Sequence, residues 1–147
     1  MHVLVTGSTG FLGCHVYDLL SSDDRIKTIT TTHRSKPNKV RDKETVLINP
    51  KELPQVDAIV HLMGMVNHSN NQDDTIYKVN VDETMKLLVW AHECNARMIF
   101  ASSSGVQHCH NSSTIFEKES NKWSKISKKY PYYKSKMMAE EQGRAYA

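Results

Sequence analysis

Apolar residues occur along the chain in short runs that alternate with longer segments in which they recur at helical spacing. Residues 2–6 form an apolar, β-branched run that predicts a strand. A glycine-rich turn follows, and then a predicted helix whose apolar face comprises Leu12, Val16, Leu19 and Leu20. The N-terminal pattern is therefore strand, turn and helix.

The rest of the chain continues this alternation. Further strands are expected at residues 26–32, 45–48 and 57–63, and in the stretch "RMIFASSS" at residues 97–104. A long helix is predicted up to about His92, with its apolar face at Val81, Thr84, Met85, Leu88 and Val89. A last helix should start near Pro131, because the fixed φ angle and missing N–H of proline suit a first turn. These elements predict an α/β fold, a doubly wound parallel sheet with helices on both faces.

Composition agrees with one globular domain in a reducing compartment. The chain has 147 residues, of which 39% are hydrophobic and 24% charged, and its formal net charge is +3. Its three cysteines, Cys14, Cys94 and Cys109, form no disulfide pattern and no Cys-x-x-Cys metal motif. No apolar stretch approaches the roughly 20 residues that cross a bilayer, and no signal-peptide pattern opens the chain. We expect a cytoplasmic protein that is neither membrane-bound nor exported.

The turn after the first strand, in "VLVTGSTGFLG", has glycines three residues apart at Gly7, Gly10 and Gly13. A strand, a glycine-rich turn and a helix direct backbone N–H groups at one point, which favours a phosphate. Gly7 should permit the tight turn, Gly10 the approach of a pyrophosphate, and Gly13 close packing of the helix. We interpret the turn as a dinucleotide site, with a tight turn that binds nothing as the alternative. The residues assigned to the cofactor here are Gly7, Thr9, Gly10, Phe11, Leu12 and Gly13.

A second candidate site combines serines with a tyrosine and a lysine. The fifth predicted strand ends in Ser102, Ser103 and Ser104, and "YYKSK" places Tyr132 and Lys136 on one face of the last helix. A lysine ammonium beside a phenol stabilises the phenolate, so such a pair can move a proton in carbonyl or alcohol chemistry. Alone, the Tyr-x-x-x-Lys spacing is common on surface helices and carries little weight.

Five stretches together resemble a known family: "VLVTGSTGFLG", "DAIVHLMG", "KVNVDETMKLL", "MIFASSS" and "YYKSKMMAEE". In this order, they are similar to the extended short-chain dehydrogenases/reductases, which include NAD(P)-dependent epimerases, dehydratases and dihydroflavonol-type reductases. The resemblance covers almost the whole chain and implies a Rossmann-type fold. It also implies hydride exchange between a nicotinamide dinucleotide and a small-molecule carbonyl or alcohol substrate.

The resemblance assigns a Ser, Tyr, Lys catalytic set. Tyr132 would transfer a proton to or from the substrate oxygen, and Lys136 would assist it and hold the nicotinamide ribose. Ser103 would position the substrate oxygen, with the serine that follows it as the alternative. Tyr130 and Lys134 form an overlapping pair and are the weaker candidate.

Cofactor choice depends on the end of the second predicted strand. NAD-binding relatives place an acidic residue there, whereas NADP-binding ones supply a cation for the 2′-phosphate. The stretch "TTTHRSKPNK" contains no acid, and Arg34 offers a bidentate donor that suits a phosphate, with Lys36 close by. NADP is therefore favoured over NAD, and a solvated basic loop is the alternative. Asn49 matches the position that faces the adenine in relatives, or it caps a turn.

The nicotinamide half of the cofactor site is expected near two further segments. Leu62, Met63 and Gly64 follow the fourth strand and would line the cofactor mainly with backbone, although Met63 replaces the small alanine usual in the family. Asn80 matches a family asparagine near the nicotinamide, with a helix cap or a surface amide as the alternative. His61, in an apolar strand, is interpreted as a packed histidine.

Other features are interpreted without a ligand. His108, Cys109 and His110 have no fourth partner for a zinc site, so no metal is expected. Glu117 and Glu119 interrupt the lysines of the polar segment before the last helix, and the overall charge is small, which disfavours nucleic-acid binding.

The relatives continue past the Tyr-Lys helix into a substrate-binding domain, whereas this chain ends at Ala147 in a helical pattern. The expectation is one NAD(P)-binding Rossmann domain, residues 1–147, truncated after that helix and without the substrate domain. Three functions are weighed: an oxidoreductase, epimerase or dehydratase of the extended type; a cofactor-binding regulatory or scaffold module without catalysis; and a basic nucleic-acid binder. A homodimer is left open, and the substrate is not readable.

Overall fold

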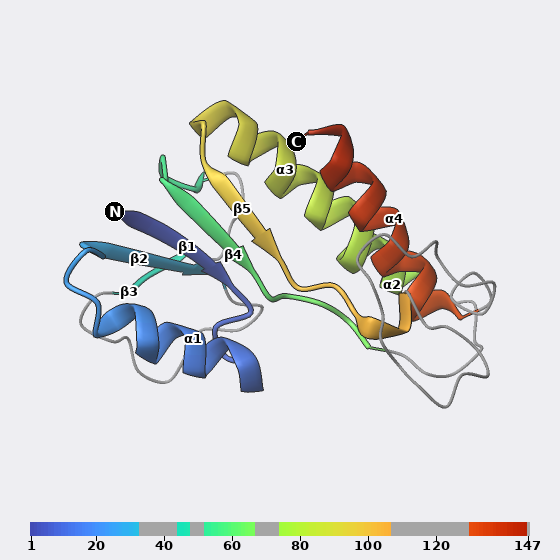
Figure 1. Cartoon of the computed structure of the whole chain (residues 1–147), viewed down its shortest axis with the longest axis horizontal. Coiled ribbons are helices and arrows are strands. Elements are labelled where there is room, and N and C mark those ends of the chain that lie inside the picture. The colour runs from blue at the N-terminus through green and yellow to red at the C-terminus, as the bar shows by residue number, and fades with distance from the viewer. Residues whose placement is uncertain (33–43, 48–51, 67–73, 107–129, 147) are drawn as a thin grey trace, which may run out of the picture. The chain divides into compact units, whose positions relative to one another are not determined.

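A parallel sheet forms the centre of the computed structural model, which describes residues 1–32, 44–47, 52–66, 74–106 and 130–146. Its strands are β1 (His2–Thr6), β2 (Thr28–Thr32), β3 (Glu44–Leu47), β4 (Ala58–His61) and β5 (Arg97–Phe100). All pairings are parallel, and the order is β3-β2-β1-β4-β5 (Figure 1). The predicted α/β class and parallel sheet are therefore confirmed.

The helices begin and end close to the predicted positions. They are α1 (Phe11–Ser21), α2 (Thr75–Tyr77), α3 (Glu83–Cys94) and α4 (Pro131–Ala145), with a π-helical turn at Lys78–Asp82 and a 3₁₀ turn at Ser104–Val106. The predicted long helix corresponds to α2, the π-helical turn and α3, which follow one another along the chain without a break. Pro131 is the first residue of α4, in agreement with the sequence.

The strand order reverses at β1, which is the central strand. From β1 the chain passes through α1 to β2 and β3, and then returns to add β4 and β5 on the other side. Right-handed crossovers put the helices of the two halves on opposite faces, and α1 and the Val89–Cys94 part of α3 do lie on opposite sides of the sheet (Figure 1). Ligands of such sheets bind outside the carboxyl ends of the strands at this reversal, here β1 and β4.

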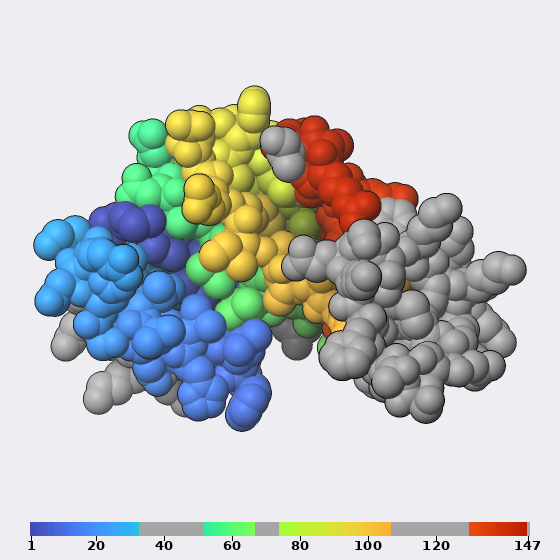
Figure 2. All heavy atoms as spheres, viewed as in Figure 1, coloured from blue at the N-terminus to red at the C-terminus, as the bar shows by residue number. Residues whose placement is uncertain are grey.

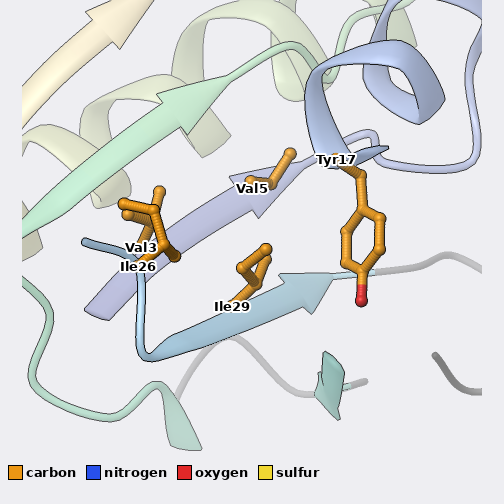
Figure 3. Close-up of a cluster of buried hydrophobic side chains, with 5 residues drawn as sticks. All are labelled: Val3, Val5, Tyr17, Ile26 and Ile29. Carbon is orange, nitrogen blue, oxygen red and sulfur yellow. The ribbon is translucent and has the colours of Figure 1, made fainter. Parts of the chain in front are cut away.

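One face of the sheet is buried beneath α1. Val3 and Val5 of β1, Ile29 of β2, Tyr17 of α1 and Ile26 form one buried cluster (Figure 3). These side chains are shielded from water because a parallel sheet covered on both faces buries nearly every strand residue.

The predicted apolar face of α1 is partly wrong. Leu12 is 53% exposed and Leu19 71% exposed, and Figure 2 shows α1 (blue) at the molecular surface. The residues that α1 buries are Gly13 and Tyr17, with Leu20 packed against the core. The helix is rotated toward this face because Gly13 is held against the backbone of the preceding turn.

The chain divides into two compact units. The first comprises Met1–Gly64 and Val89–Ala101, and it contains the sheet and α1. The second comprises Met65–Leu88 and Ser102–Ala147, and it contains α2, the π-helical turn and α4.

The rotation of α1 predicts unequal effects of truncating two of its side chains. Tyr17→Ala should lower the free energy of unfolding by about 3–5 kcal/mol, because it empties the centre of the cluster. Leu19→Ala should change it by no more than about 0.5 kcal/mol, because this side chain is exposed. Urea unfolding monitored by circular dichroism measures both, and comparable losses would contradict the orientation of α1.

Candidate functional site

Two of the three glycines in the turn after β1 are required by contacts within the chain. Gly7 has a φ of +72°, and a Cβ there would lie 2.8 Å from the backbone nitrogen of Met63. A Cβ at Gly13 would lie 2.0 Å from the carbonyl oxygen of Gly7. A side chain at either position would collide with backbone, so these two glycines serve the fold whether or not a ligand binds.

Gly10 is different, because among the described residues no backbone atom comes as close to a Cβ at this position as at Gly7 or Gly13. Its backbone is extended, with φ −78° and ψ 169°, a conformation open to any residue. Among the described residues, a Cβ would meet one atom within 4 Å, the carbonyl oxygen of Gly7 at 3.2 Å, a tight contact that requires a shift of a few tenths of an ångström. The described residues thus leave more space beside Gly10 than beside the other two glycines.

The N-terminus of α1 adjoins this space and is electropositive. No side chain caps it, and its first turn carries no acidic residue. The first helical hydrogen bond runs from the Cys14 N–H to the Gly10 carbonyl, so the N–H groups of Phe11, Leu12 and Gly13 have no partner within the helix. Such a terminus favours an anion.

The side chains around the turn are consistent with recognition through the backbone. The side chains of Thr9, Phe11 and Leu12 are exposed, so the groups that this turn offers to a ligand are its backbone N–H groups. The Ser8 hydroxyl is buried and has no hydrogen-bond partner among the described residues. A group that supplies acceptor oxygens at this turn therefore fits the donors present.

The segment after β4 is pinned to the end of β1. The Met63 N–H donates to Thr6 Oγ1 at 3.2 Å, and the Leu62 N–H donates to the Thr6 carbonyl at 3.2 Å. Thr6 Oγ1 also lies 2.6 Å from Nδ1 of His61, which is buried and stacked on Phe100. His61 is therefore a packed histidine, as expected, and these contacts bring the Met63 backbone against the glycine turn.

Asn80, in the second unit, links two segments of the chain. Its Oδ1 accepts the Met65 N–H at 2.7 Å, and its Nδ2 donates to the Met65 carbonyl at 2.9 Å and to Ser135 Oγ at 3.0 Å. At 1% exposure it is not a surface amide. Both Nδ2 protons donate hydrogen bonds within the chain, so this amide serves the fold as a clamp between Met65 and Ser135. The π-helical turn that contains Asn80 directs its side chain toward these partners.

The helix α4 holds the predicted tyrosine and lysine in unequal surroundings. Tyr132 is half-buried, whereas Lys136 is only 5% exposed. Burial lowers the pKa of Lys136 below its ordinary value, because desolvation disfavours the ammonium. Between them, Ser135 accepts from Asn80 and donates to the Tyr132 carbonyl at 2.7 Å, which ties this turn of α4 to the clamp.

The overlapping pair has a different environment. Tyr130 is exposed and precedes α4 in an extended conformation. Lys134 is exposed, and its Nζ lies 5.9 Å from the ring centroid of Tyr77, a cation–π distance. Unlike Lys136, this lysine is not buried.

The serine segment, residues 102–105, follows β5 and is held by hydrogen bonds. Ser103 is half-buried, and its Oγ accepts the Gly105 N–H at 3.3 Å. Ser104 is exposed at the start of the 3₁₀ turn. Ser102 Oγ donates to Glu140 Oε1 on α4. Sequence reasoning missed Glu140 as a partner, and its only local signal is its position four residues after Lys136 on the same helix face.

Several predicted residues lie outside the described part of the chain. They are Arg34, Lys36, Asn49, His108, Cys109 and His110, and their roles stay predictions. Among the described residues, no group of three or more His, Cys, Asp or Glu side chains could hold a metal ion. None of the described helices has the length and apolar character needed to cross a membrane.

The glycine turn with Leu62, Met63 and Gly64 belongs to the first unit. Asn80, Ser103, Tyr132 and Lys136 belong to the second. The residues of the first unit offer backbone N–H donors and open space, and those of the second offer a hydroxyl, a phenol and a buried amine.

The chain is similar to known proteins in sequence and in fold. The sequence model of the NAD dependent epimerase/dehydratase family matches residues 3–147. Uncharacterized protein 052L of Frog virus 3 (isolate Goorha) is 30% identical over 114 residues, which are 69% of this chain and 32% of that protein. The solved structure of MoeE5 in complex with UDP-glucuronic acid and NAD has a TM-score of 0.81 at 22% identity, over 99% of this chain and 49% of its own.

A second solved structure is similar in fold to this chain to nearly the same degree. UDP-N-acetylglucosamine 4-epimerase from Methanobrevibacter ruminantium M1, in complex with UDP-N-acetylmuramic acid, has a TM-score of 0.80 at 25% identity, over 99% of this chain and 50% of its own. The chain therefore spans between about a third and a half of the length of these relatives.

Proposed function

Because this chain belongs to the NAD-dependent epimerase/dehydratase family, we propose that it binds a nicotinamide dinucleotide and carries the proton-transfer residues of an oxidoreductase, epimerase or dehydratase. The observation that carries the proposal is the open space at Gly10, since packing and backbone conformation account for the other two glycines but not for this one. A pyrophosphate beside Gly10 would accept hydrogen bonds from the N–H groups at the start of α1.

The remainder of the cofactor would lie along the carboxyl ends of β1 and β4. The backbone of Leu62, Met63 and Gly64 follows β4, and the hydrogen bonds to Thr6 give this segment a fixed place beside the turn. Lys136 would hold the nicotinamide ribose, as in the family that the chain resembles. MoeE5 was solved with NAD, which supports a dinucleotide of this class.

NADP is the proposed form of the cofactor. The stretch "TTTHRSKPNK" at the end of β2 carries no acidic residue to accept the ribose hydroxyls, and it contains Arg34. A guanidinium forms bidentate, charge-assisted hydrogen bonds with a phosphate, which only the 2′-phosphate of NADP supplies at this place.

The proposed chemistry divides between cofactor and protein. A bound nicotinamide supplies hydride exchange with a substrate carbon. The Tyr132 hydroxyl would donate a proton to the substrate oxygen in reduction or accept one in oxidation, while Ser103 Oγ holds that oxygen. The ammonium of Lys136, removed from water, would stabilise the phenolate of Tyr132 more strongly than a solvated lysine would.

The substrate class is proposed from the solved relatives. Both were solved in complex with a UDP-linked sugar, and this favours a nucleoside diphosphate sugar whose carbinol or carbonyl carbon exchanges the hydride. Cofactor binding without turnover of any such sugar would favour the second candidate function, a dinucleotide-binding regulatory module.

Gly10→Val tests cofactor binding directly. The variant should lose measurable affinity for NADPH and NADH, because the added side chain fills the place proposed for the pyrophosphate. Isothermal titration measures the affinity. Gly143→Val is the matched control, since a Cβ at Gly143 meets nothing within 4 Å, and it should bind normally. Retained binding by a folded Gly10→Val protein would overturn the proposal.

Arg34→Ala tests the choice between the two cofactors. In the unmutated protein, NADPH should bind about 10- to 100-fold more tightly than NADH, as expected for a charge-assisted contact. Arg34→Ala should abolish most of that preference and leave NADH affinity unchanged. Equal affinities in the unmutated protein would show that NADP is not preferred.

Tyr132→Phe separates catalysis from binding. Because the ring is kept and the transferable proton is removed, kcat with a UDP-sugar substrate should fall by about 10²- to 10⁴-fold. Cofactor affinity should change little. Tyr130→Phe, in the overlapping pair, should leave kcat nearly unchanged, and the reverse pattern would transfer the role to Tyr130.

A further inference from the structure

The serine segment is anchored on α4 at two points, one on each side of Ser103. On one side, Ser102 Oγ donates a hydrogen bond to Glu140 Oε1. On the other side, Gly105 lies against the ring of Tyr133, so closely that a Cβ there would be 2.2 Å from Cε1. All of these residues belong to the second unit. The segment that carries Ser103 is thus held between a carboxylate and an aromatic ring of one helix.

We propose that Glu140 is a positioning residue, which sets the place of Ser103 relative to Tyr132 and Lys136 by holding Ser102. The inference rests on the proposed function, because the position of Ser103 affects turnover only if its hydroxyl holds the substrate oxygen. Glu140 itself contacts neither substrate nor cofactor in this proposal.

The geometry of α4 explains why one carboxylate can have this effect. Tyr132, Lys136 and Glu140 follow one another at intervals of four residues, so they lie along one side of the helix. A helix is stiff over two turns, and a hydrogen bond from Glu140 therefore fixes its partner in the same frame as the phenol and the amine. No loop intervenes between the anchor and the reacting groups.

The charge of Glu140 strengthens the anchor. Its side chain is only 19% exposed, and Arg144 Nη2 lies 4.0 Å from the second carboxylate oxygen, Oε2. One oxygen is thus directed to the serine segment and the other to the guanidinium. A hydroxyl that donates to an ionised carboxylate forms a stronger hydrogen bond than one that donates to a neutral acceptor.

The contact at Gly105 predicts what happens when the anchor is lost. Tyr133 would still hold the far end of the segment, so removal of Glu140 should let Ser102 and Ser103 move without unfolding the unit. A displacement of about 1 Å at a substrate-positioning group can lower a rate by about 10²-fold. The expected defect is therefore one of kcat, with binding largely preserved.

Four variants test the proposal in the full chain: Glu140→Ala, Glu140→Gln, Ser102→Ala and Glu141→Gln. Glu140→Ala should lower kcat about 10- to 100-fold, while KM and the NADPH dissociation constant change by less than about threefold. Glu140→Gln should recover most of kcat, because the amide oxygen still accepts the Ser102 hydroxyl. Glu141→Gln, at an exposed position of the same helix, should match the unmutated protein.

A double-mutant cycle identifies the partner. Ser102→Ala should resemble Glu140→Ala, and the double variant should be no slower than either single one, since both remove the same hydrogen bond. Additive losses, an unchanged kcat in Glu140→Ala, or an equal loss in Glu141→Gln would each overturn the proposal.

Amide hydrogen exchange provides a readout that does not need turnover. Exchange at Ser103, Gly105 and Val106 should be faster in Glu140→Ala and Ser102→Ala than in the unmutated protein or Glu141→Gln. Unchanged exchange at these amides would overturn the proposal even in an active protein. A wild-type protein that turns over no substrate, but shows this exchange pattern, would contradict the proposed function and leave the positioning by Glu140 supported.

Discussion

The close approach of two backbone segments at Gly7 is the constraint on which the arrangement of the glycine turn depends. Gly7 has a positive φ and lies so near Met63 that no Cβ fits between them. The same approach lets Thr6 bond to both Leu62 and Met63, and it leaves the Gly7 carbonyl facing Gly13. The carboxyl ends of β1 and β4 and the start of α1 are therefore fixed together, at the point where strand order reverses.

The second unit has an equivalent constraint in the buried face of α4. Ser135 and Lys136 are both buried, and the hydroxyl of Ser135 joins the Asn80 amide to the Tyr132 carbonyl. Each buried polar group in this chain of contacts has a partner, as low-dielectric surroundings demand. One turn of helix thereby acquires a defined position relative to the Met65 backbone, far from it in sequence.

Local patterns were sufficient for the elements of the fold. Alternating apolar runs and helical periodicity predicted the five strands, and proline chemistry predicted the start of α4 at Pro131. Periodicity failed on α1, where Leu12 and Leu19 offered a plausible apolar face. The orientation of α1 was decided instead by the contact of Gly13 with the Gly7 carbonyl, which no helical pattern records.

Local motifs single out candidate site residues, as at Gly10 or in the spacing of Tyr132 and Lys136, and the roles assigned to these residues stay predictions. The links between segments were not. The Asn80–Ser135 and Thr6–His61 hydrogen bonds each join residues 55 positions apart, and Ser102 and Glu140 are 38 apart. Serine, threonine and asparagine have many partners open to them in a sequence, and only the fold selects one.

The burial of Lys136 joins stability and function in the proposed mechanism. Desolvation makes its ammonium less favourable, and the lowered pKa of Lys136 expresses this cost. In the same surroundings, an anion that forms beside the ammonium is attracted more strongly than it would be in water. A solvated lysine at this position would cost the fold less, but it would also stabilise a phenolate less. In the proposed mechanism, the desolvation of Lys136 is thus offset by its effect on proton transfer.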